Sequence, residues 1–296
     1  MKPTHIVFLL AINVLWGFNF VASKMAVDGL PPLLVTGLRF LIVFVLLVPF
    51  LKVIPGQMRR VLAIAFLLGV INFAAIFIGL AKAGDVSSVA IVAQLGVPFS
   101  TLMAIIFLGE RIGLWRTGGI FLAFAGAMVL GFDPKVLQYG EAMLWILLSA
   151  VVYGVVAVQM RRLEGVPPMT LTAWMGLISF PCHFLLSAAF ESGQIPALAA
   201  ASAENIFGVV YAAIAATIIG HAGFYFLLNR YSVTAVMPST LLGPVFAVIS
   251  AILVFDEVLT MRMLAGGLIT FAGIAIITFR NAKPAAEGVP RVRPTA

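Results

Sequence analysis

The chain has very little charge: Asp, Glu, Lys and Arg together make up only 10% of its 296 residues. Water-soluble domains carry about 25% of these residues. Cysteine is nearly absent as well, because Cys182 stands alone inside an apolar stretch. It can form no internal disulfide, and the chain shows no metal-ligand spacing. The composition therefore excludes a soluble enzyme, and we predict no metal site and no cofactor.

Motifs of nucleotide hydrolysis and nucleic-acid binding are absent too. The chain has no glycine-rich loop ending in Lys and Ser or Thr, so ATP hydrolysis is not predicted. Its net charge is +7 and its pI is near 9.9, but the basic residues stand in short gaps between apolar stretches and not in a patch with aromatics. We therefore predict no nucleic-acid partner and interpret the charge as a sign of membrane topology.

Apolar residues dominate the chain, at 62% of the total with a mean hydropathy of +1.15. They form ten continuous stretches, each close to the roughly 20 residues with which a helix crosses a bilayer. The stretches show no two-residue alternation, so helices are favoured over barrel strands. We predict an all-α membrane protein with ten transmembrane helices at residues 6–27, 33–51, 61–81, 86–108, 117–132, 141–160, 170–190, 206–228, 234–255 and 264–279.

Basic residues are distributed unevenly between alternate gaps. If the N-terminus is cytoplasmic, only Lys82, Lys135 and Arg262 lie in outer loops, and most of the other Lys and Arg residues lie inside. Retention of Lys and Arg in short cytoplasmic loops is typical of membrane proteins. No small-residue cleavage site follows the first stretch, which is therefore interpreted as a retained helix. We predict a multi-pass inner-membrane protein with both termini in the cytoplasm.

Residue types recur between the two halves at a nearly constant offset. The offset is 136 or 137 residues early in the chain and 146 to 148 later, and a longer connection at 191–205 accounts for the change. The matching pairs are Trp16 with Tyr153, Gly17 with Gly154, Pro31 with Pro167, Lys82 with Arg230, Pro98 with Pro244, Glu110 with Glu257 and Gly126 with Gly273. We predict two five-helix repeats, at residues 1–135 and 136–280, followed by a cytoplasmic tail at 281–296.

An odd number of helices in each repeat makes the second copy enter the membrane from the opposite side. Such inverted repeats are typical of transporters, in which two nearly equivalent halves exchange conformations around a shared site. The repeat therefore indicates alternating access, by analogy with that class of fold.

Three short motifs stand out in the chain. They are the stretch 15–21 (LWGFNFV), the triplet Leu38-Arg39-Phe40, and a proline followed by an apolar stretch and an acid, which occurs after Pro98 and again after Pro244. With these motifs the sequence resembles the EamA family of the drug/metabolite transporter superfamily. The resemblance covers about residues 5 to 280. The sequence departs from the family pattern in the fourth helix, because Pro98 lies one residue closer to Glu110 than Pro244 does to Glu257. The resemblance implies ten helices, cytoplasmic termini and export of small metabolites such as amino acids.

Aromatic residues near the middles of four predicted helices are candidates for substrate binding. Under the repeat, Phe73 and Phe77 correspond to His221 and Tyr225, and each pair is one helical turn apart on a single face. Together with Trp16, Phe20 and Tyr153, these side chains would line an amphipathic central cavity for flat ligands with a polar end. Asn19 and Asn72 would supply amide groups. Aromatic packing and hydrogen bonds between helices are the alternative roles for all nine residues.

Ionisable side chains inside the spans are the next candidates, because burying them in hydrocarbon is costly. His221 titrates near neutral pH and would couple transport to a proton, whereas the alternative is a neutral histidine bonded to a facing carbonyl or hydroxyl. Lys24, four residues before Asp28, is expected to reach the interface or to form an ion pair along its helix. Arg39 is expected to make an orienting contact with carbonyls or lipid headgroups, and substrate binding is the alternative role.

Two further features concern movement and packing. Pro98 and Pro244 each remove a backbone hydrogen bond near the middle of a helix, so both are predicted hinges. Gly119 and Gly126 lie on one ridge of the fifth helix, and Gly266 and Gly273 lie on one ridge of the tenth. Small residues at this spacing indicate that the two helices pack closely.

These observations together predict a secondary transporter that exports small amphipathic metabolites by alternating access, with amino acids, and aromatic ones above all, as substrates. A passive facilitator or channel is the first alternative. An intramembrane enzyme is the second, although the sequence shows no cluster of catalytic groups at membrane depth. The predicted partners are a small-molecule substrate and the lipid bilayer. The oligomeric state stays open, and a monomer is compatible with the sequence.

Overall fold

A computed structural model describes residues 1–109, 113–228, 230–231 and 236–280, except for the side chains of residues 225, 228, 237, 238, 279 and 280. Glu110, the side chain of Tyr225 and the predicted tail therefore lie outside the described part. The regular secondary structure of that part is entirely helical, with no β-strand. It contains nine helical runs that are long and apolar enough to cross a membrane, and a shorter apolar run at Ser239–Phe255.

These ten runs coincide with the ten predicted segments, which confirms the predicted fold class. They are α1 (Pro3–Gly29); α2 (Pro32–Leu47) with η1 (Val48–Phe50); α3 (Met58–Phe66), η2 (Leu67–Asn72) and α4 (Phe73–Lys82); α5 (Val86–Ala93) and α6 (Gly96–Leu108); α7 (Leu114–Gly131); α9 (Gly140–Arg161); α10 (Pro168–Phe190); α12 (Ala203–Tyr211), η3 (Ala212–Ile219) and α13 (Gly220–Leu228); η4 (Met237–Leu241) and α15 (Leu242–Phe255); and α16 (Met261–Arg280). The short helices α8 (Pro134–Leu137) and α11 (Gln194–Ala199) connect spans.

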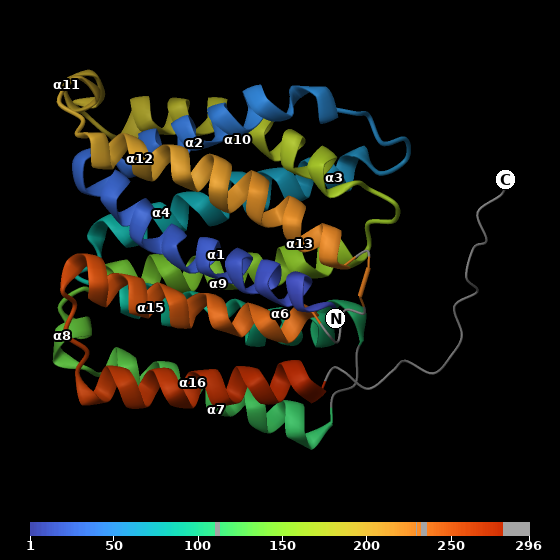
Figure 1. The fold of residues 1–296 in the computed structure, drawn as a ribbon, viewed down its shortest axis with the longest axis vertical. Coiled ribbons are helices and arrows are strands. Elements are labelled where there is room, and N and C mark those ends of the chain that lie inside the picture. Colours follow the sequence, from blue (N-terminus) through green and yellow to red (C-terminus); the bar gives the residue numbers. More distant parts are fainter. Residues whose placement is uncertain (110–112, 229, 232–235, 281–296) are drawn as a thin grey trace, which may run out of the picture.

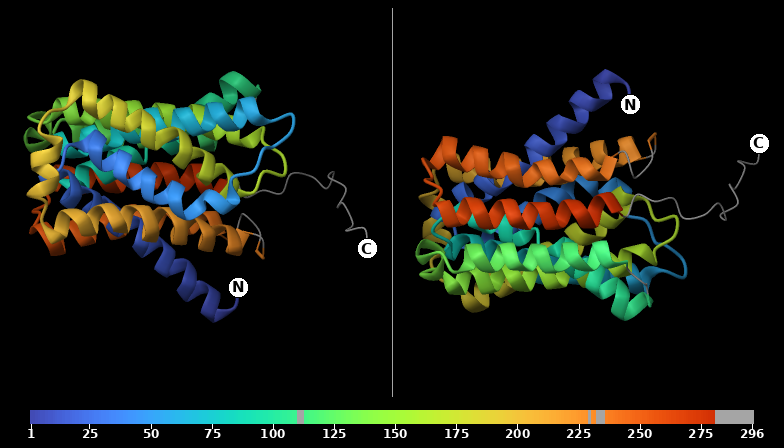
Figure 2. Two further views of the ribbon diagram at one scale, coloured as in Figure 1. Left: turned by 90° about the horizontal axis from the view of Figure 1, so that it is seen from above. Right: turned by 90° about the horizontal axis from the view of Figure 1, so that it is seen from below.

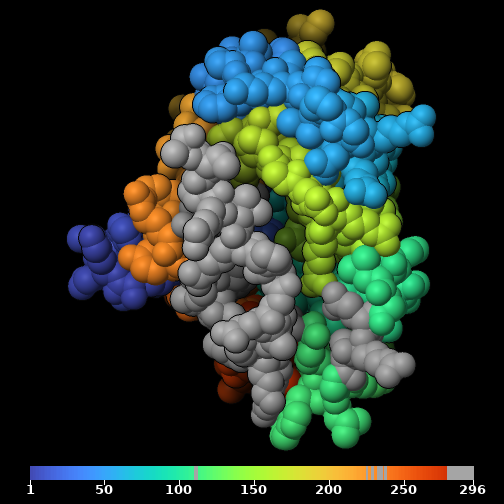
Figure 3. Space-filling view, turned by 90° about the vertical axis from the view of Figure 1, so that its right-hand side faces the viewer, coloured from blue at the N-terminus to red at the C-terminus, as the bar shows by residue number. Residues whose placement is uncertain are grey.

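The spans lie side by side with their axes roughly parallel (Figure 1). The N-terminus and the C-terminal end of α16 lie at one end of the bundle, here called the N-terminal end, and α8 and α11 lie at the other, here called the far end. The beginning of α1 projects sideways from the bundle in both views of Figure 2. Figure 3 looks onto the N-terminal end, where the surface is hollowed beside the yellow-green segment that follows α9.

The packing of the spans follows a two-fold pattern. α1 packs against α15 and α12, and α9 packs against α6 and α4. α2 pairs with α10, and α7 pairs with α16. Under the offset of the predicted repeat, α1 corresponds to α9, α15 to α6, and the α12–α13 span to the α3–α4 span. These principal contacts therefore occur in equivalent pairs under that offset.

The glycine ridges of α7 and α16 pack as closely as predicted. A Cβ atom on Gly126 would lie only 2.4 Å from the backbone nitrogen of Thr270, and one on Gly273 would lie 2.4 Å from that of Ala123. Real Cβ atoms do not approach backbone atoms so closely, so only glycine permits this separation. The two backbones are in direct contact, as in other close-packed membrane helices.

Two pairs of spans depart from α-helical geometry at corresponding places. The spans that contain α3 and α12 pass through the π-helical segments η2 and η3 near their middles. The chain leaves the α-helix at Gln94 and Leu95, so that α6 begins two residues before Pro98. The 3₁₀ segment η4 precedes α15, which begins two residues before Pro244. Proline lacks the backbone N–H that would continue the helix across each break.

Carboxylates hold helix starts at the far end of the bundle. Glu191, which follows α10, accepts the first two N–H groups of α2 at 2.7 and 3.1 Å. Glu257, which follows α15, accepts the first two N–H groups of α5 at 2.5 and 3.1 Å. A carboxylate at a helix N-terminus satisfies free backbone donors and complements the helix dipole. Each of these acids therefore links the end of one span to the start of another by hydrogen bonds.

Candidate functional site

Arg39 lies near the middle of the span Pro32–Phe50 and is the most buried Lys or Arg that the structure describes, with 3% of its surface exposed. It is about 10 Å from the start of α2. One guanidinium nitrogen, Nη2, donates to the hydroxyl of Thr217 at 2.8 Å. The buried Nε and Nη1 have no hydrogen-bond partner among the described residues. The charge is therefore only partly satisfied inside the protein.

Aromatic rings surround the guanidinium. Its central carbon lies 4.5 Å from the ring centroid of Phe73, 5.6 Å from that of Phe77 and 5.8 Å from that of Phe40. A guanidinium within about 6 Å of a ring face gains electrostatic attraction from the π electrons. The rings stabilise the cation but provide no hydrogen-bond acceptor for its remaining N–H groups.

The π-helical segment η3 forms the opposite side of the site. Thr217 donates its hydroxyl proton to the carbonyl of Ala212, five residues earlier, at 2.7 Å, so its oxygen is free to accept from Arg39. The Thr217 carbonyl lies 2.8 Å from Nδ1 of His221. A carbonyl can only accept, so Nδ1 carries the proton and Nε2 is the unprotonated nitrogen of the neutral ring. Thr217 therefore links the arginine to the histidine.

Trp16 completes the site from α1. Its indole N–H donates to the carbonyl of Ala216 at 3.1 Å, and its ring centroid lies 5.7 Å from that of His221. We call Trp16, Arg39, Phe73, Phe77, Thr217 and His221 the Arg39 cluster. It combines a cation with flat apolar surfaces and an imidazole at the middles of four spans, an arrangement suited to an anionic group attached to an apolar one.

Four of the predicted site residues, Trp16, Phe73, Phe77 and His221, are thus brought together. Asn72 is buried elsewhere, and its amide donates to the carbonyl of Ser149 at 2.7 Å, which is the predicted alternative of a bond between helices. Tyr153 is 47% exposed and borders Gly96 of α6.

Two further predicted residues are not among the contacts that define the cluster, and the side chain of a third is not described. Phe20 packs against the main apolar core, to which Phe77 of the Arg39 cluster also belongs. Asn19 is partly buried, and its side-chain oxygen has no hydrogen-bond partner among the described residues. The side chain of Tyr225 is outside the described part.

Arg39 and Thr217 are the members of the cluster that sequence reasoning did not select. Among the described residues, Arg39 makes its hydrogen bond to the hydroxyl of Thr217 and not to a backbone carbonyl. A threonine in an apolar helix gives no signal of its own. The burial of a basic residue two turns into a span was the available signal for Arg39. Lys24, by contrast, forms the expected ion pair with Asp28 at 2.7 Å.

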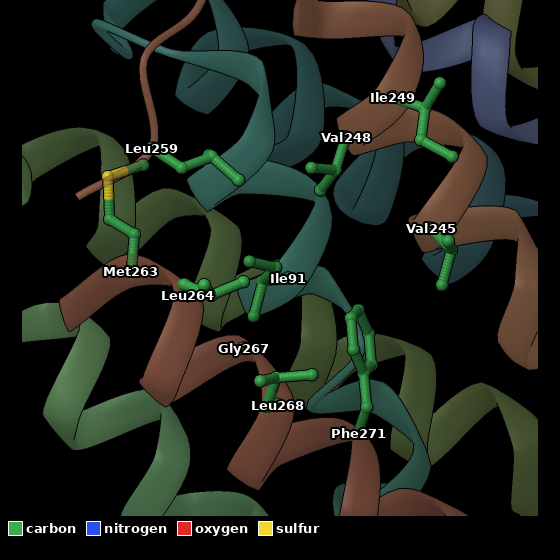
Figure 4. A pocket seen from close by; sticks show the side chains of 10 residues that line it. All are labelled: Ile91, Val245, Val248, Ile249, Leu259, Met263, Leu264, Gly267, Leu268 and Phe271. Carbon is green, nitrogen blue, oxygen red and sulfur yellow. The ribbon is translucent and has the colours of Figure 1, made fainter. Parts of the chain in front are cut away.

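A cleft of about 180 Å³ lies away from this cluster, between α5, α15 and α16 (Figure 4). The side chains in Figure 4 are all apolar, and Ile91 and Phe271 face the cleft from different spans. None of the residues predicted to bind substrate lines it. The cleft therefore offers no polar group that would orient a metabolite.

Two segments of the chain, residues 4–132 and 140–279, match the sequence profile of the EamA-like transporter family. A "Probable amino-acid metabolite efflux pump" of Escherichia coli (strain K12) is 28% identical over 281 residues, which cover 92% of this chain and 94% of that protein. A protein of the same name from Salmonella typhimurium (strain LT2) is 29% identical over 280 residues, which cover 91% of this chain and 93% of that one.

A solved crystal structure has the same fold, with a TM-score of 0.62 over 96% of this chain and 100% of the other. The two sequences are 20% identical, so this likeness concerns the fold alone.

Proposed function

The chain belongs to the EamA-like transporter family, and from that premise we propose that it is a secondary exporter of small amphipathic metabolites, with amino acids, and aromatic ones above all, as substrates. The observation that carries the proposal is the pair of relatives named as amino-acid metabolite efflux pumps, which align with more than nine-tenths of both chains. The Arg39 cluster supports it, because a cation beside aromatic rings suits an amino acid better than a sugar or a metal ion.

Alternating access of two inverted halves, residues 1–135 and 136–280, is the proposed mechanism. The two-fold pattern of helix contacts and the two matched family segments support this division. The breaks before Pro98 and Pro244 would be the hinges, because α6 and α15 meet the preceding segments there without a continuous helical hydrogen-bond ladder. The π-helical segments η2 and η3 add a second pair of irregular turns at corresponding depth.

The substrate is proposed to contact Trp16, Phe73, Phe77 and His221. Asn19, Phe20, Asn72, Tyr153 and Tyr225 would join this lining when the halves exchange conformations. Both termini are proposed to face the cytoplasm of a cell with an inner membrane. Among the described Lys and Arg residues, only Lys82, Lys135 and Arg262 stand in or directly beside far-end connections, which fits an outer position for that end.

Counterflow in proteoliposomes tests the function. Vesicles loaded with one unlabelled amino acid are diluted into each labelled amino acid in turn, and saturable accumulation that depends on the internal amino acid is expected for a carrier. Flux that does not saturate would indicate a channel or facilitator. Chemical conversion of the added compound without exchange would indicate an enzyme.

Coupling to protons through His221 has a separate test. In His221→Gln vesicles, exchange is expected to persist while the dependence of net export on external pH is lost, because glutamine keeps a donor but does not titrate. An unchanged pH dependence in this variant would contradict the coupling role and leave the export function intact.

A further inference from the structure

We propose that the guanidinium of Arg39 binds the carboxylate of the transported molecule, so that a free carboxylate is the feature shared by the substrates of this site. The inference rests on the proposed function and deepens it, because it names the group by which a substrate is recognised. It concerns a residue for which the sequence favoured an orienting contact over substrate binding.

The first argument is that the charge of Arg39 is incompletely compensated. A guanidinium has five N–H donors and no acceptor, and burying it in an apolar interior is costly unless it is paired. Arg39 is 3% exposed, yet Thr217 provides its single hydrogen-bond acceptor among the described residues. Neither of the two ion pairs found in the described part of the chain includes it. An anion from outside the protein is the partner that this group lacks.

The second argument concerns the hydroxyl that faces Arg39. The hydroxyl of Thr217 donates a hydrogen bond to the carbonyl of Ala212, so its oxygen can accept a hydrogen bond from Nη2 of Arg39. This arrangement orients the guanidinium without neutralising it. A carboxylate that approaches the cluster would find Nε and Nη1 without partners and would form the strong, charge-assisted hydrogen bonds typical of arginine.

The third argument is the asymmetry between the halves. Gly37 of α2 faces the ring of Phe184, and Gly176 of α10 faces Phe44, so α2 and α10 pack closely against each other. Under the offset of 136 that pairs Pro31 with Pro167, Arg39 corresponds to Met175, and no Lys or Arg stands between Leu171 and Phe180 of α10. The cation is therefore present once. The cation therefore marks one side of the site as polar. The ring of Phe73, whose centroid lies 4.5 Å from the central guanidinium carbon, provides an apolar surface beside it.

A substrate with a carboxylate and a flat apolar side chain would span these two features. In the described conformation α2 and η3 enclose Arg39, so the carboxylate would reach it when the halves of the transporter move apart. The alternative role of Arg39 is purely structural: it would tie α2 to η3 through Thr217 and never meet the substrate. The two roles differ in their effect on substrate selectivity.

The experiment compares an acid with its neutral counterpart on the complete protein in proteoliposomes. Unlabelled competitors are added to the counterflow of labelled phenylalanine, or of the amino acid that the wild type exchanges fastest. The competitors are the same amino acid, its carboxamide and its decarboxylated amine. We expect the acid to compete at least about tenfold better than either analogue, because each of them lacks the charged acceptor for Arg39.

Variants assign that preference to Arg39. Arg39→Gln is expected to reduce exchange at least about tenfold and to abolish the preference for the acid, whereas Arg39→Lys, which keeps the charge, retains part of it. Lys24→Gln is the matched control: it removes another basic residue from the membrane interior, but one that already has a carboxylate partner. It should keep the wild-type preference. Thermal unfolding of each purified variant shows whether it is folded.

The outcomes separate the two proposals. If the wild type exchanges amino acids but the carboxamide competes as well as the acid, the inference is overturned and the proposed function stands, and this result needs no variant. A folded Arg39→Gln protein that keeps the preference for the acid also overturns the inference. If the wild type exchanges no amino acid at all, the proposed function is overturned and the inference falls with it.

Discussion

The far end of the bundle and its middle differ in how they treat charge. At the far end, Lys24 meets the carboxylate of Asp28 at 2.7 Å, and its side chain is 16% exposed. In the middle, Arg39 is more deeply buried and meets a hydroxyl and three aromatic rings but no carboxylate. Among the described residues, Lys24 at the far end has a carboxylate partner, whereas Arg39 in the middle has none and is the cation that we propose to bind the substrate carboxylate.

The far-end acids sharpen this contrast. Glu191 and Glu257 are occupied by backbone N–H groups of α2 and α5. Asp133 caps α8 and accepts the hydroxyl of Thr260. Each carboxylate thus has structural partners at a helix end, and none is near Arg39. The difference indicates that charge serves stability at the far end and recognition in the middle, and four predictions test it.

The largest effect is expected from giving Arg39 an internal carboxylate. Thr217→Asp places an acid where the hydroxyl now lies 2.8 Å from Nη2. The new ion pair would make Arg39 resemble Lys24 and would compete with the substrate carboxylate. Exchange of amino acids should fall by about 100-fold or more, since close buried charge pairs are worth several kcal/mol. The counterflow assay in proteoliposomes measures this rate of exchange.

Thr217→Asn is the control for this change, because it has nearly the same shape without the charge. It should reduce exchange far less than Thr217→Asp. Equal losses in the two folded variants would mean that shape at residue 217, and not charge at Arg39, limits transport.

A stability effect is expected at the far end. In Glu257→Gln, the amide keeps one acceptor oxygen but turns an NH₂ group toward donors at the start of α5. The loss should be about 2 kcal/mol, as for a charge-assisted cap. Thermal unfolding in detergent measures it, with Glu141→Gln as control, because Glu141 belongs to an exposed ion pair with Lys82. A control as destabilised as Glu257→Gln would count against the cap.

A smaller, pH-dependent effect is expected for Asp133. The hydroxyl of Thr260 and the N–H of Lys135 stabilise its charged form, aided by Arg262, and they lower the pKa of its carboxyl although burial opposes them. A lowered pKa stabilises the fold above the unfolded value of about 3.9. This stabilisation disappears as the pH falls through the lower value in the folded state.

The variant Asp133→Asn should therefore unfold more easily than the wild type at pH 7, by about 1 kcal/mol. The gap should close as the pH falls below about 4. Unfolding midpoints at several pH values measure it. A gap that persists unchanged at the acidic end would show that the charge of Asp133 is not its cause.

The smallest effect is expected from Lys24→Gln. An ion pair between residues four apart on a helix contributes at most about 0.5 kcal/mol, and Asp28 is half exposed. Exchange should stay within about twofold of the wild type, since this cation has no role in recognition. A loss of exchange as large as that of Arg39→Gln would contradict the proposed difference between Lys24 at the far end and Arg39 in the middle.

Sequence reasoning predicted the spans because each depends on local composition. Ten apolar stretches of suitable length became ten helical runs, and the contact between the ridges of Gly126 and Gly266 followed from spacing alone. The ion pair of Lys24 was also predictable, because its partner is four residues away on the same helix. These features need no knowledge of the tertiary arrangement.

The Arg39 cluster was predicted only in part, because its contacts are distant in sequence. Thr217 is 178 residues from Arg39, and the N–H groups that Glu257 accepts are 170 and 171 residues from it. The π-helical turns gave no signal either, since an additional residue in a turn leaves the apolar composition unchanged. The symmetry argument did bring Phe73 and His221 into one hypothesis, because the repeat relates their helices.

The direct backbone contact between α7 and α16 has a practical consequence for measuring motion in this protein. Helices without side chains between them cannot change their separation without opening a void, so this pair is a natural fixed reference. Spin labels at the exposed positions Leu114 and Leu268 should therefore report a constant distance throughout the working cycle. Distances from labels on other helices to this fixed pair would then report how those helices move.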